Sequence, residues 1–449
     1  MFAVVYIPFC IVAVLYFFLK NLPFFFPGKL QAATGTLFLI ILSGALKAQP
    51  GQDTLFRPGT VFSQPKKYPL FSYNPNHQTD LNDLLGKLVS KKSAGHRDTV
   101  QMHIPGKVRL SAIPAVGYTL QTGFTGIFSG NLAWYTNAMP KTNISTIVTS
   151  ISYTQYNQII LPLQVNIWSK NGKYNFQADD RFLKYPSYTY GLGGNTMVDS
   201  GYLIDYDYLR LHQSVSRKIG KDLYLGLGYD YDHFWNIREI DPDTSLKPTD
   251  FEVYGLTKNV TSSGLSLSIL YDSRRNSLNP DQGTLFNLAF RPRFTFLGSD
   301  QNWQSLTLDY RSYFKFPARS RNILAFWSYD WFTLGGSPPY LLLPSTGWDP
   351  QSNTGRGYIQ GRFRSTNMLY VESEYRFGIT PNGLLGGVFF VNAESFSEKV
   401  TNKFQYVAPG YGFGIRLKLN KFSGSNLCID YGFGQNGSGG IAVNLGEVF

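Results

Sequence analysis

The sequence predicts an all-β protein, a transmembrane antiparallel β-barrel of about sixteen strands. Three observations indicate this fold class. The chain of 449 residues contains 30 Tyr and 35 Phe, yet its mean hydropathy is only −0.15. Strand-length segments with alternating apolar and polar side chains run from Lys107 to the end of the sequence, and the last residue is aromatic. Composition alone fits a soluble all-β protein equally well, so the strand-length segments are needed to distinguish a soluble protein from a membrane barrel.

Residues 1–48 are expected to form a leader that is removed on export. Two apolar stretches lie here, at residues 2–19 and from Leu37 to Leu46. The second stretch precedes Lys47-Ala48 and is typical of the hydrophobic region and cleavage site of a secretory signal. The first stretch is long enough to cross a bilayer, so an inner-membrane anchor is one alternative, and a true start of the protein downstream of residues 2–19 is another.

Residues 49–106 are polar and contain several prolines, which indicates a periplasmic segment before the barrel. Within it, Thr79-Asp80 can cap a short helix over residues 79–92. The leucines of this segment fall on one helical face: Leu81, Leu84, Leu85 and Leu88. Such a helix could plug the lumen or lie on the membrane surface, and a simple linker is the third possibility.

Residues 107–449 are expected to form the barrel itself, because apolar residues alternate there with glycine or charge. Successive side chains on a strand point to opposite faces, so each segment has one apolar wall and one polar wall. The intervening polar positions of four clear segments are Gly226, Gly228, Asp230 and Asp232; Asn287, Arg291 and Arg293; Asp309, Arg311 and Lys315; and Gly412, Gly414, Arg416 and Lys418.

Segment length separates a soluble sandwich from a membrane barrel. In a sandwich the apolar wall would face a core, whereas in a membrane barrel it faces lipid and the charges face the lumen. Soluble strands are mostly about five or six residues long. The segments here run to about nine residues or more, which is the length of a tilted strand that crosses a bilayer. Length therefore favours the barrel.

The end of the sequence is expected to form the last strand, which closes the barrel. Ile441, Val443, Leu445 and Phe449 are expected to share its apolar face. A last strand that ends in an aromatic residue resembles the signal by which outer-membrane proteins are recognised for insertion. The residues expected to carry that signal are Leu445, Gly446 and Phe449.

Several motifs in the second half of the chain occur in the order of one known family. Gly355-Arg356-Gly357-Tyr358 lies in a long loop, followed by a strand that carries Glu372, Glu374 and Arg376 on one face. The next strand contains Val388-Phe389-Phe390-Val391-Asn392-Ala393, and the turn residues Asp272, Arg274, Pro280 and Gly283 lie upstream. Together these motifs resemble the outer-membrane assembly and secretion superfamily, which includes BamA-like and TamA-like barrels (the bacterial surface antigen domain) and two-partner secretion transporters.

The resemblance implies that the long loop folds into the lumen and that Arg356, with Gly357 and Tyr358, forms its tip. Glu374 is then placed to receive Arg356. Asn392 stands where the family usually has Asp, so the second contact to the arginine is expected to be a neutral hydrogen bond, weaker by about half. Anchoring of the loop without any mechanistic role is an equally simple reading of Arg356.

The chain also departs from the family, because residues 49–106 are too short to hold the periplasmic POTRA modules of many large assembly barrels. We therefore expect a short member, in bacterial outer-membrane lipid. It would assist insertion or translocation of client outer-membrane proteins, or of lipid, through a seam between the segment near 108–119 and residues 438–449, alone or with other assembly components. A passive or plugged pore is the alternative.

The sequence gives little support for nucleic-acid binding, for a metal or redox site, or for catalysis. The formal net charge is +12, but no basic stripe or basic helix indicates nucleic-acid binding. The five histidines lack the spacing of metal ligands, and Cys10 and Cys428 form no redox or zinc motif. No nucleophile–base pair or cofactor fingerprint appears, so we expect neither an enzyme nor a cofactor.

Overall fold

The computed structural model describes residues 78–81, 83–84, 106, 108–119, 121–136, 143–240, 248–274, 276–421 and 423–449. All of them belong to one compact unit, Tyr68–Phe449. The expected leader, residues 1–48, and most of the expected periplasmic segment lie outside the described residues. Within the described part of the chain, no helix is both long and apolar enough to cross a membrane.

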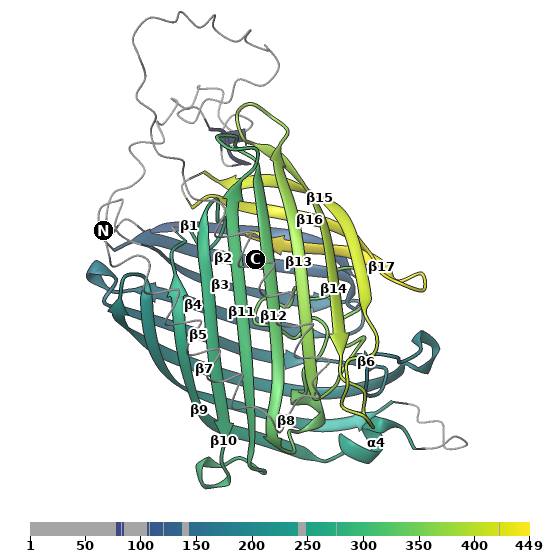
Figure 1. Ribbon diagram of the computed structural model, residues 1–449. Coiled ribbons are helices and arrows are strands. Elements are labelled where there is room, and N and C mark those ends of the chain that lie inside the picture. The colour runs from purple at the N-terminus through teal and green to yellow at the C-terminus, as the bar shows by residue number, and fades with distance from the viewer. Residues whose placement is uncertain are drawn as a thin grey trace, which may run out of the picture. The chain divides into compact units, whose positions relative to one another are not determined.

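One antiparallel sheet of seventeen strands makes up nearly all of this unit (Figure 1). β6 has only three residues and lies beside β7, so sixteen strands form the wall. The strands are β1 (Arg109–Thr119), β2 (Gly123–Tyr135), β3 (Ile144–Thr154), β4 (Ile159–Trp168), β5 (Tyr174–Lys184), β6 (Ser187–Thr189), β7 (Tyr202–Gly220), β8 (Leu223–Glu239), β9 (Asn259–Asp272), β10 (Gly283–Arg293), β11 (Trp303–Lys315), β12 (Ile323–Gly336), β13 (Asn367–Gly378), β14 (Leu385–Phe396), β15 (Ala408–Asn420), β16 (Ser425–Phe433) and β17 (Gly439–Leu445).

Between the strands, helical structure is sparse in the described residues. The elements are α4 (Asp250–Tyr254) and four 3₁₀ turns: η2 (Lys170–Gly172), η3 (Val198–Ser200), η4 (Thr295–Leu297) and η5 (Tyr340–Leu342). The three longest connections, 185–201, 240–258 and 337–366, all lie at one end of the sheet, and we call this the loop end. The opposite end carries shorter connections, such as 221–222, 379–384 and 421–424, and we call this the turn end.

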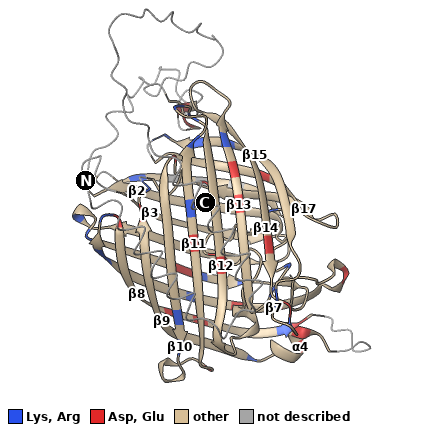
Figure 2. Cartoon of the chain, viewed as in Figure 1, with Lys and Arg blue, Asp and Glu red and all other residues tan. Residues whose placement is uncertain are grey.

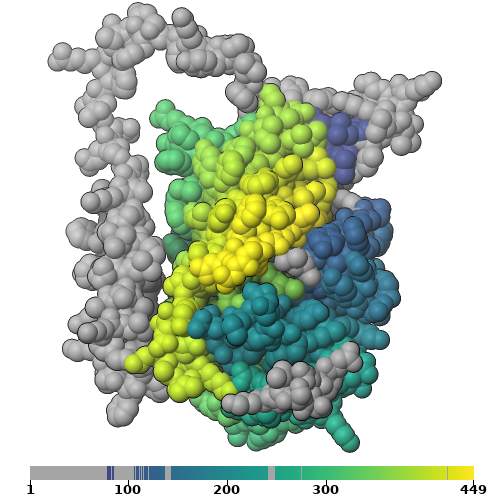
Figure 3. Space-filling model, turned by 90° about the vertical axis from the view of Figure 1, so that its right-hand side faces the viewer, coloured from purple at the N-terminus to yellow at the C-terminus, as the bar shows by residue number. Residues whose placement is uncertain are grey.

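The sheet curls back on itself, so its first and last strands lie side by side (Figures 1 and 3). A Cβ atom placed on Gly117 in β1 would lie 3.8 Å from Cγ2 of Val443 in β17. Every other pair of neighbouring wall strands is joined by an antiparallel ladder, but among the described residues no ladder joins β1 to β17. We call this junction the seam.

The apolar side chains of the wall point outward and the charges point inward. In β8, Leu227 is 59% exposed, whereas Asp230 and Asp232 on the opposite face are 3% and 1% exposed. The same inversion holds in β14 and β15, where Val391 and Phe413 are exposed and Arg416 is buried. Charged residues lie along the strands themselves (Figure 2). A soluble sandwich would bury the opposite register, so the fold class predicted from the alternation, a transmembrane antiparallel barrel, is confirmed.

The short N-terminal helix begins at the predicted place. Leu81, Asp83 and Leu84 are helical, and Asp80 caps them: its Oδ1 accepts from the backbone N–H of Asp83 at 2.9 Å. This segment lies at the turn end, where Lys421 Nζ approaches Oδ2 of Asp83 at 2.8 Å. The described helical residues therefore bind the turns of the wall, while residues 85–92 of the predicted helix lie outside the described residues.

Candidate functional site

The long connection between β12 and β13, residues 337–366, folds back into the lumen. Most of its side chains from position 340 onward are buried although it has no place in the sheet. Gln164 Nε2 of β4 donates to the carbonyl of Pro350 at 2.7 Å, and on the far wall the hydroxyl of Tyr358 donates to the carbonyl of Pro409 at 2.6 Å. The loop thus spans the lumen from one wall to the other, and we call it the inward loop.

Arg356 at the tip of this loop is held by three carboxylates. Its guanidinium pairs with Glu372 and Glu374 of β13, and Nη1 lies 2.7 Å from Oδ2 of Asp430 in β16. Glu372 and Glu374 reach the same point because alternate residues of a strand share a face. Burial alone would lower the pKa of Arg356, but the three carboxylates hold it well above its usual value. The arginine is therefore charged inside the lumen.

Strand β14 completes the setting of Arg356. The ring of Phe390 lies 3.7 Å from the guanidinium carbon, a cation–π contact. Asn392, two residues on and on the same face, donates from Nδ2 to the backbone carbonyl of Arg356 at 2.9 Å. The expectation that Asn392 contacts the guanidinium is thus wrong: its amide holds the main chain, because Asp430 already occupies the third side of the guanidinium.

Gly357 brings the loop backbone against the wall. Its φ is +109°, and a Cβ atom there would lie 2.6 Å from the carbonyl oxygen of Phe433. The wall offers a glycine in return, since a Cβ on Gly432 would lie 2.6 Å from the nitrogen of Gly357. Ser438 then donates from Oγ to the carbonyl of Gly357 at 2.7 Å. Only two facing glycines allow this approach.

Tyr358 ties the tip to the start of β15 and to the connection between β16 and β17. Its hydroxyl donates to Pro409 and accepts from the backbone N–H of Gln435 at 3.0 Å. The ring of Phe363, also in the inward loop, packs edge-on against it at 5.5 Å. Arg356, Gly357 and Tyr358 therefore bind one sector of the wall, β13 to β16, together with the connection to the seam strand β17.

The upstream turn motif forms a second inward structure, at the turn end. Arg274 pairs with Asp272 through two hydrogen bonds of 3.0 Å, and both side chains are buried. Gly283 begins β10 with φ at +104°, and Pro280 is buried in the turn before it. From this base the turn reaches the opposite wall, where Asn276 donates from Nδ2 to the carbonyl of Ser423 at 2.6 Å.

The expected insertion-signal residues do not form one outward face. Leu445 is the last residue of β17, and Gly446, with φ at +93°, turns the chain out of the sheet. Phe449 is 2% exposed and stacks on Trp327 with ring centroids 5.2 Å apart. The predicted place of Phe449 beside Ile441 is therefore wrong, because the chain leaves the strand at Gly446 and continues inside the lumen.

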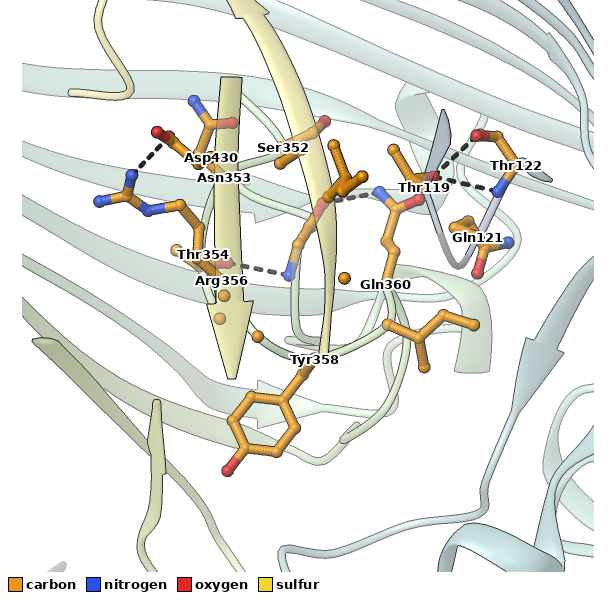
Figure 4. A pocket seen from close by; sticks show the side chains of 18 of the residues that line it. Thr119, Gln121, Thr122, Ser352, Asn353, Thr354, Arg356, Tyr358, Gln360 and Asp430 are labelled. Atoms are coloured by element: carbon orange, nitrogen blue, oxygen red, sulfur yellow. Dashed lines mark hydrogen bonds and ion pairs between the residues drawn. The ribbon is translucent and has the colours of Figure 1, made fainter. Parts of the chain in front are cut away.

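A cavity of about 180 Å³ lies between the inward loop and the seam (Figure 4). Gly440 to Ala442 of β17 form one side, and Thr119, Gln121 and Thr122 at the β1–β2 turn form another. The loop contributes the residues from Ser352 to Gln360. Among the described lining residues, the charged side chains are Arg356 and Asp430, which pair with each other, and glycine backbone, hydroxyls and amides provide the other polar groups.

Sequence reasoning missed a further buried network, on the wall opposite the strands that carry Glu372, Glu374 and Asp430. Arg181 lies 2.7 Å from Asp179 on β5, and Arg210 of β7 lies 3.1 Å from the same carboxylate. Arg181 also donates to Oγ of Ser352 in the inward loop at 3.2 Å. The signal was an Asp and an Arg two residues apart on one strand, but which loop they face could not be read from the sequence.

These features define a class of protein: a membrane-spanning barrel with an inward loop in its lumen and a seam between its first and last strands. No family model matches the sequence, and no curated protein matches it. Among the solved structures that are similar in fold are the following three, each with a probability of 1.00. At these identities the similarity concerns the fold alone.

The first is BamA from Haemophilus ducreyi lacking POTRA domains 1–3: 12% identity, a TM-score of 0.46, and coverage of 76% of this chain and 75% of that one. CdiB from Acinetobacter baumannii has 13% identity and a TM-score of 0.45, over 76% of this chain and 66% of that one. CdiB from Escherichia coli has 10% identity and a TM-score of 0.46, over 82% and 72%.

Proposed function

We propose that this protein is a bacterial outer-membrane barrel that passes a client sideways through the seam. The client is a segment of an outer-membrane protein, or a lipid. The observation that carries the proposal is that no ladder joins the described residues of β1 to those of β17. Backbone hydrogen bonds are the main tie between neighbouring strands, so this junction separates at the lowest cost. The cavity directly behind the seam leaves room where a client would first enter.

The inward loop supports a resting state in which no open channel exists. It is anchored on both walls, and its tip carries the clamp of Arg356 with Glu372, Glu374 and Asp430. A lumen occupied in this way does not favour free diffusion of solutes. It favours a path at the side of the barrel, where the loop tip contacts β16 and the connection to β17.

A reversible lock across the seam tests this function. The position of a Cβ on Gly117 lies 4.0 Å from Cβ of Val443, within the range that a disulfide requires. Gly117→Cys with Val443→Cys should therefore form a bridge under oxidising conditions. The matched control is Ile429→Cys with Val443→Cys, which bridges the strands β16 and β17 that a ladder already joins.

The readout is the abundance of other outer-membrane proteins in cells whose only copy is one of these variants. We expect the oxidised seam variant to lower that abundance, reductant to restore it, and the control pair to have no effect. Unchanged abundance with a fully formed seam bridge would overturn the proposal.

A plugged pore is the second candidate, because the inward loop lies in the path that solutes would take. Deletion of residues 350–364 should then produce large single-channel currents while a locked seam has no effect on other outer-membrane proteins. Currents that stay small after the deletion would rule out this candidate.

A further inference from the structure

The four residues after β17, Gly446 to Phe449, lie inside the lumen and contact three separate parts of the fold. The backbone N–H of Gly446 donates to the carbonyl of Asn426 in β16 at 2.8 Å. The N–H of Glu447 donates to the carbonyl of Leu278, in the inward turn between β9 and β10, also at 2.8 Å. Asn353 of the inward loop donates from Nδ2 to the carbonyl of Val448 at 2.8 Å. We call residues 446–449 the inner segment.

Glu447 is the charged member of the inner segment, and its side chain is 2% exposed. Arg416 Nε of β15 donates to its Oε2 at 2.8 Å, and Arg376 Nε of β13 lies 3.7 Å from the same oxygen. Asn426 Nδ2 donates to Oε1 at 2.7 Å. Burial opposes the charge, but the two arginines and these hydrogen bonds lower the pKa of Glu447 to about 2. The carboxylate is therefore ionised and fully partnered.

Two chains of ion pairs lead from Glu447 to Arg356. In the first, Arg376 bonds Glu374 at 2.6 Å, and Glu374 pairs with Arg356. In the second, Arg416 pairs with Asp430, and Asp430 pairs with Arg356. Every side chain in both chains is at most 6% exposed, so water screens these pairs little.

We propose that Glu447 is a positioning residue that couples the seam strand β17 to the inward loop. It follows β17 by only one residue, Gly446, so an outward movement of the end of β17 withdraws the carboxylate from Arg376 and Arg416. Those arginines then pair more strongly with Glu374 and Asp430, and the ion pairs of these two carboxylates with Arg356 weaken. The loop is released when the seam opens, and by thermodynamic linkage release of the loop loosens the seam.

The consequence for transport rests on the proposed function: the coupling would make the seam open and the inward loop leave the lumen together. The coupling itself belongs to the barrel alone and can be measured without any client. A residue that only stabilises the fold would lower the stability of the whole barrel without linking these two sites.

The experiment uses the purified full-length barrel in lipid vesicles and two readouts. The first is the rate of disulfide formation in the Gly117→Cys/Val443→Cys background after addition of oxidant. The second is the rate at which protease cleaves the inward loop at residues 350–364. The variants are Glu447→Gln, Arg356→Lys and both together, and the matched control is Asp230→Asn, which breaks a buried ion pair with Arg293 in the other half of the barrel.

We expect Glu447→Gln to raise loop cleavage about tenfold, the change that follows loss of one hydrogen bond to a charged group. Arg356→Lys should slow disulfide formation at the seam, although Arg356 touches neither β1 nor β17 in any described ion pair. The double variant should cleave no faster than the stronger single variant. Asp230→Asn should alter neither rate by more than about twofold.

Loop cleavage that is unchanged in Glu447→Gln, or effects of the two substitutions that simply multiply, would overturn the coupling. These readouts involve no client, so such a result would leave the proposed seam function standing. A failure of the seam lock in cells would in turn leave the coupling intact.

Discussion

Removal of the guanidinium of Arg356 should release the inward loop while the barrel stays folded. In Arg356→Ala the three carboxylates are affected unequally. Glu374 keeps Arg376 at 2.6 Å and Asp430 keeps Arg416, whereas the described partner left to Glu372 is the hydroxyl of Tyr370. One buried carboxylate thus loses its cation, which costs about 3–5 kcal/mol. Loss of the contact with Phe390 adds about 1–2 kcal/mol.

This reasoning identifies Glu372 as the source of most of the loss, so a second substitution should partly reverse it. Arg356→Ala/Glu372→Gln replaces the orphaned carboxylate with a neutral amide, and it should recover at least about 1–2 kcal/mol relative to Arg356→Ala. Arg356→Ala/Glu374→Gln is the matched control. It should recover nothing, because it leaves Arg376 without its closest carboxylate.

The assay is a protease time course on the inward loop, combined with the temperature at which the folded band is lost on a heat-modifiability gel. We expect fast loop cleavage in Arg356→Ala, slower cleavage with Glu372→Gln, and a folded band in both. If the two double variants behave alike, the carboxylates share the loss and the assignment to Glu372 is wrong.

Three further predictions concern the inward loop, the N-terminal helix and the inner segment. Gly432→Ala should prevent the inward loop from seating and raise its cleavage at least tenfold, since the added Cβ would lie 2.6 Å from loop backbone, whereas Gly126→Ala, with nothing within 4 Å, should have no effect. Lys421→Ala should loosen the N-terminal helix at the turn end, seen as faster hydrogen exchange of Asp83 and Leu84 with the barrel unchanged, although the backbone N–H of Lys421 still donates to Asp80. The pKa of Glu447 is lowered from 4.5 to about 2, so its stabilising contribution is full above pH 4.5 and is lost as the pH falls towards 2. Acid titration of the folded band should therefore show a loss of stability in the wild type that Glu447→Gln lacks. Parallel titration curves of the two proteins would contradict this.

The wall of the barrel could be predicted from the sequence because its cause is local. Alternation in segments such as residues 223–232 fixes which side chains share a face, and segment length then favours a membrane over a soluble core. The pairing of Arg356 with Glu374 came instead from the resemblance to a family. The structure adds Glu372 and Asp430 to it, and Asp430 lies on a strand whose distance from the loop no local pattern reveals.

The misplacement of Phe449 also has a physical cause. Its register continues from Leu445 through Glu447, so an unbroken strand would have put a carboxylate on the lipid face. That cost, together with Gly446, indicates that the chain must leave the sheet there. The contacts across the lumen, such as Arg181 with Ser352, could not be predicted, because they depend on how a long loop crosses between distant walls.

The most direct test of the outward apolar face compares the unfolding free energies of two arginine variants of the barrel. Val391 is 59% exposed near the middle of β14, and Val400, in the loop between β14 and β15, is 92% exposed. If hydrocarbon surrounds the wall, Val391→Arg should destabilise the barrel in lipid vesicles by about 2–4 kcal/mol, while Val400→Arg should change its stability by no more than about 0.5 kcal/mol. Equal stability of the two variants would mean that water surrounds the wall, and the barrel would not be a membrane protein.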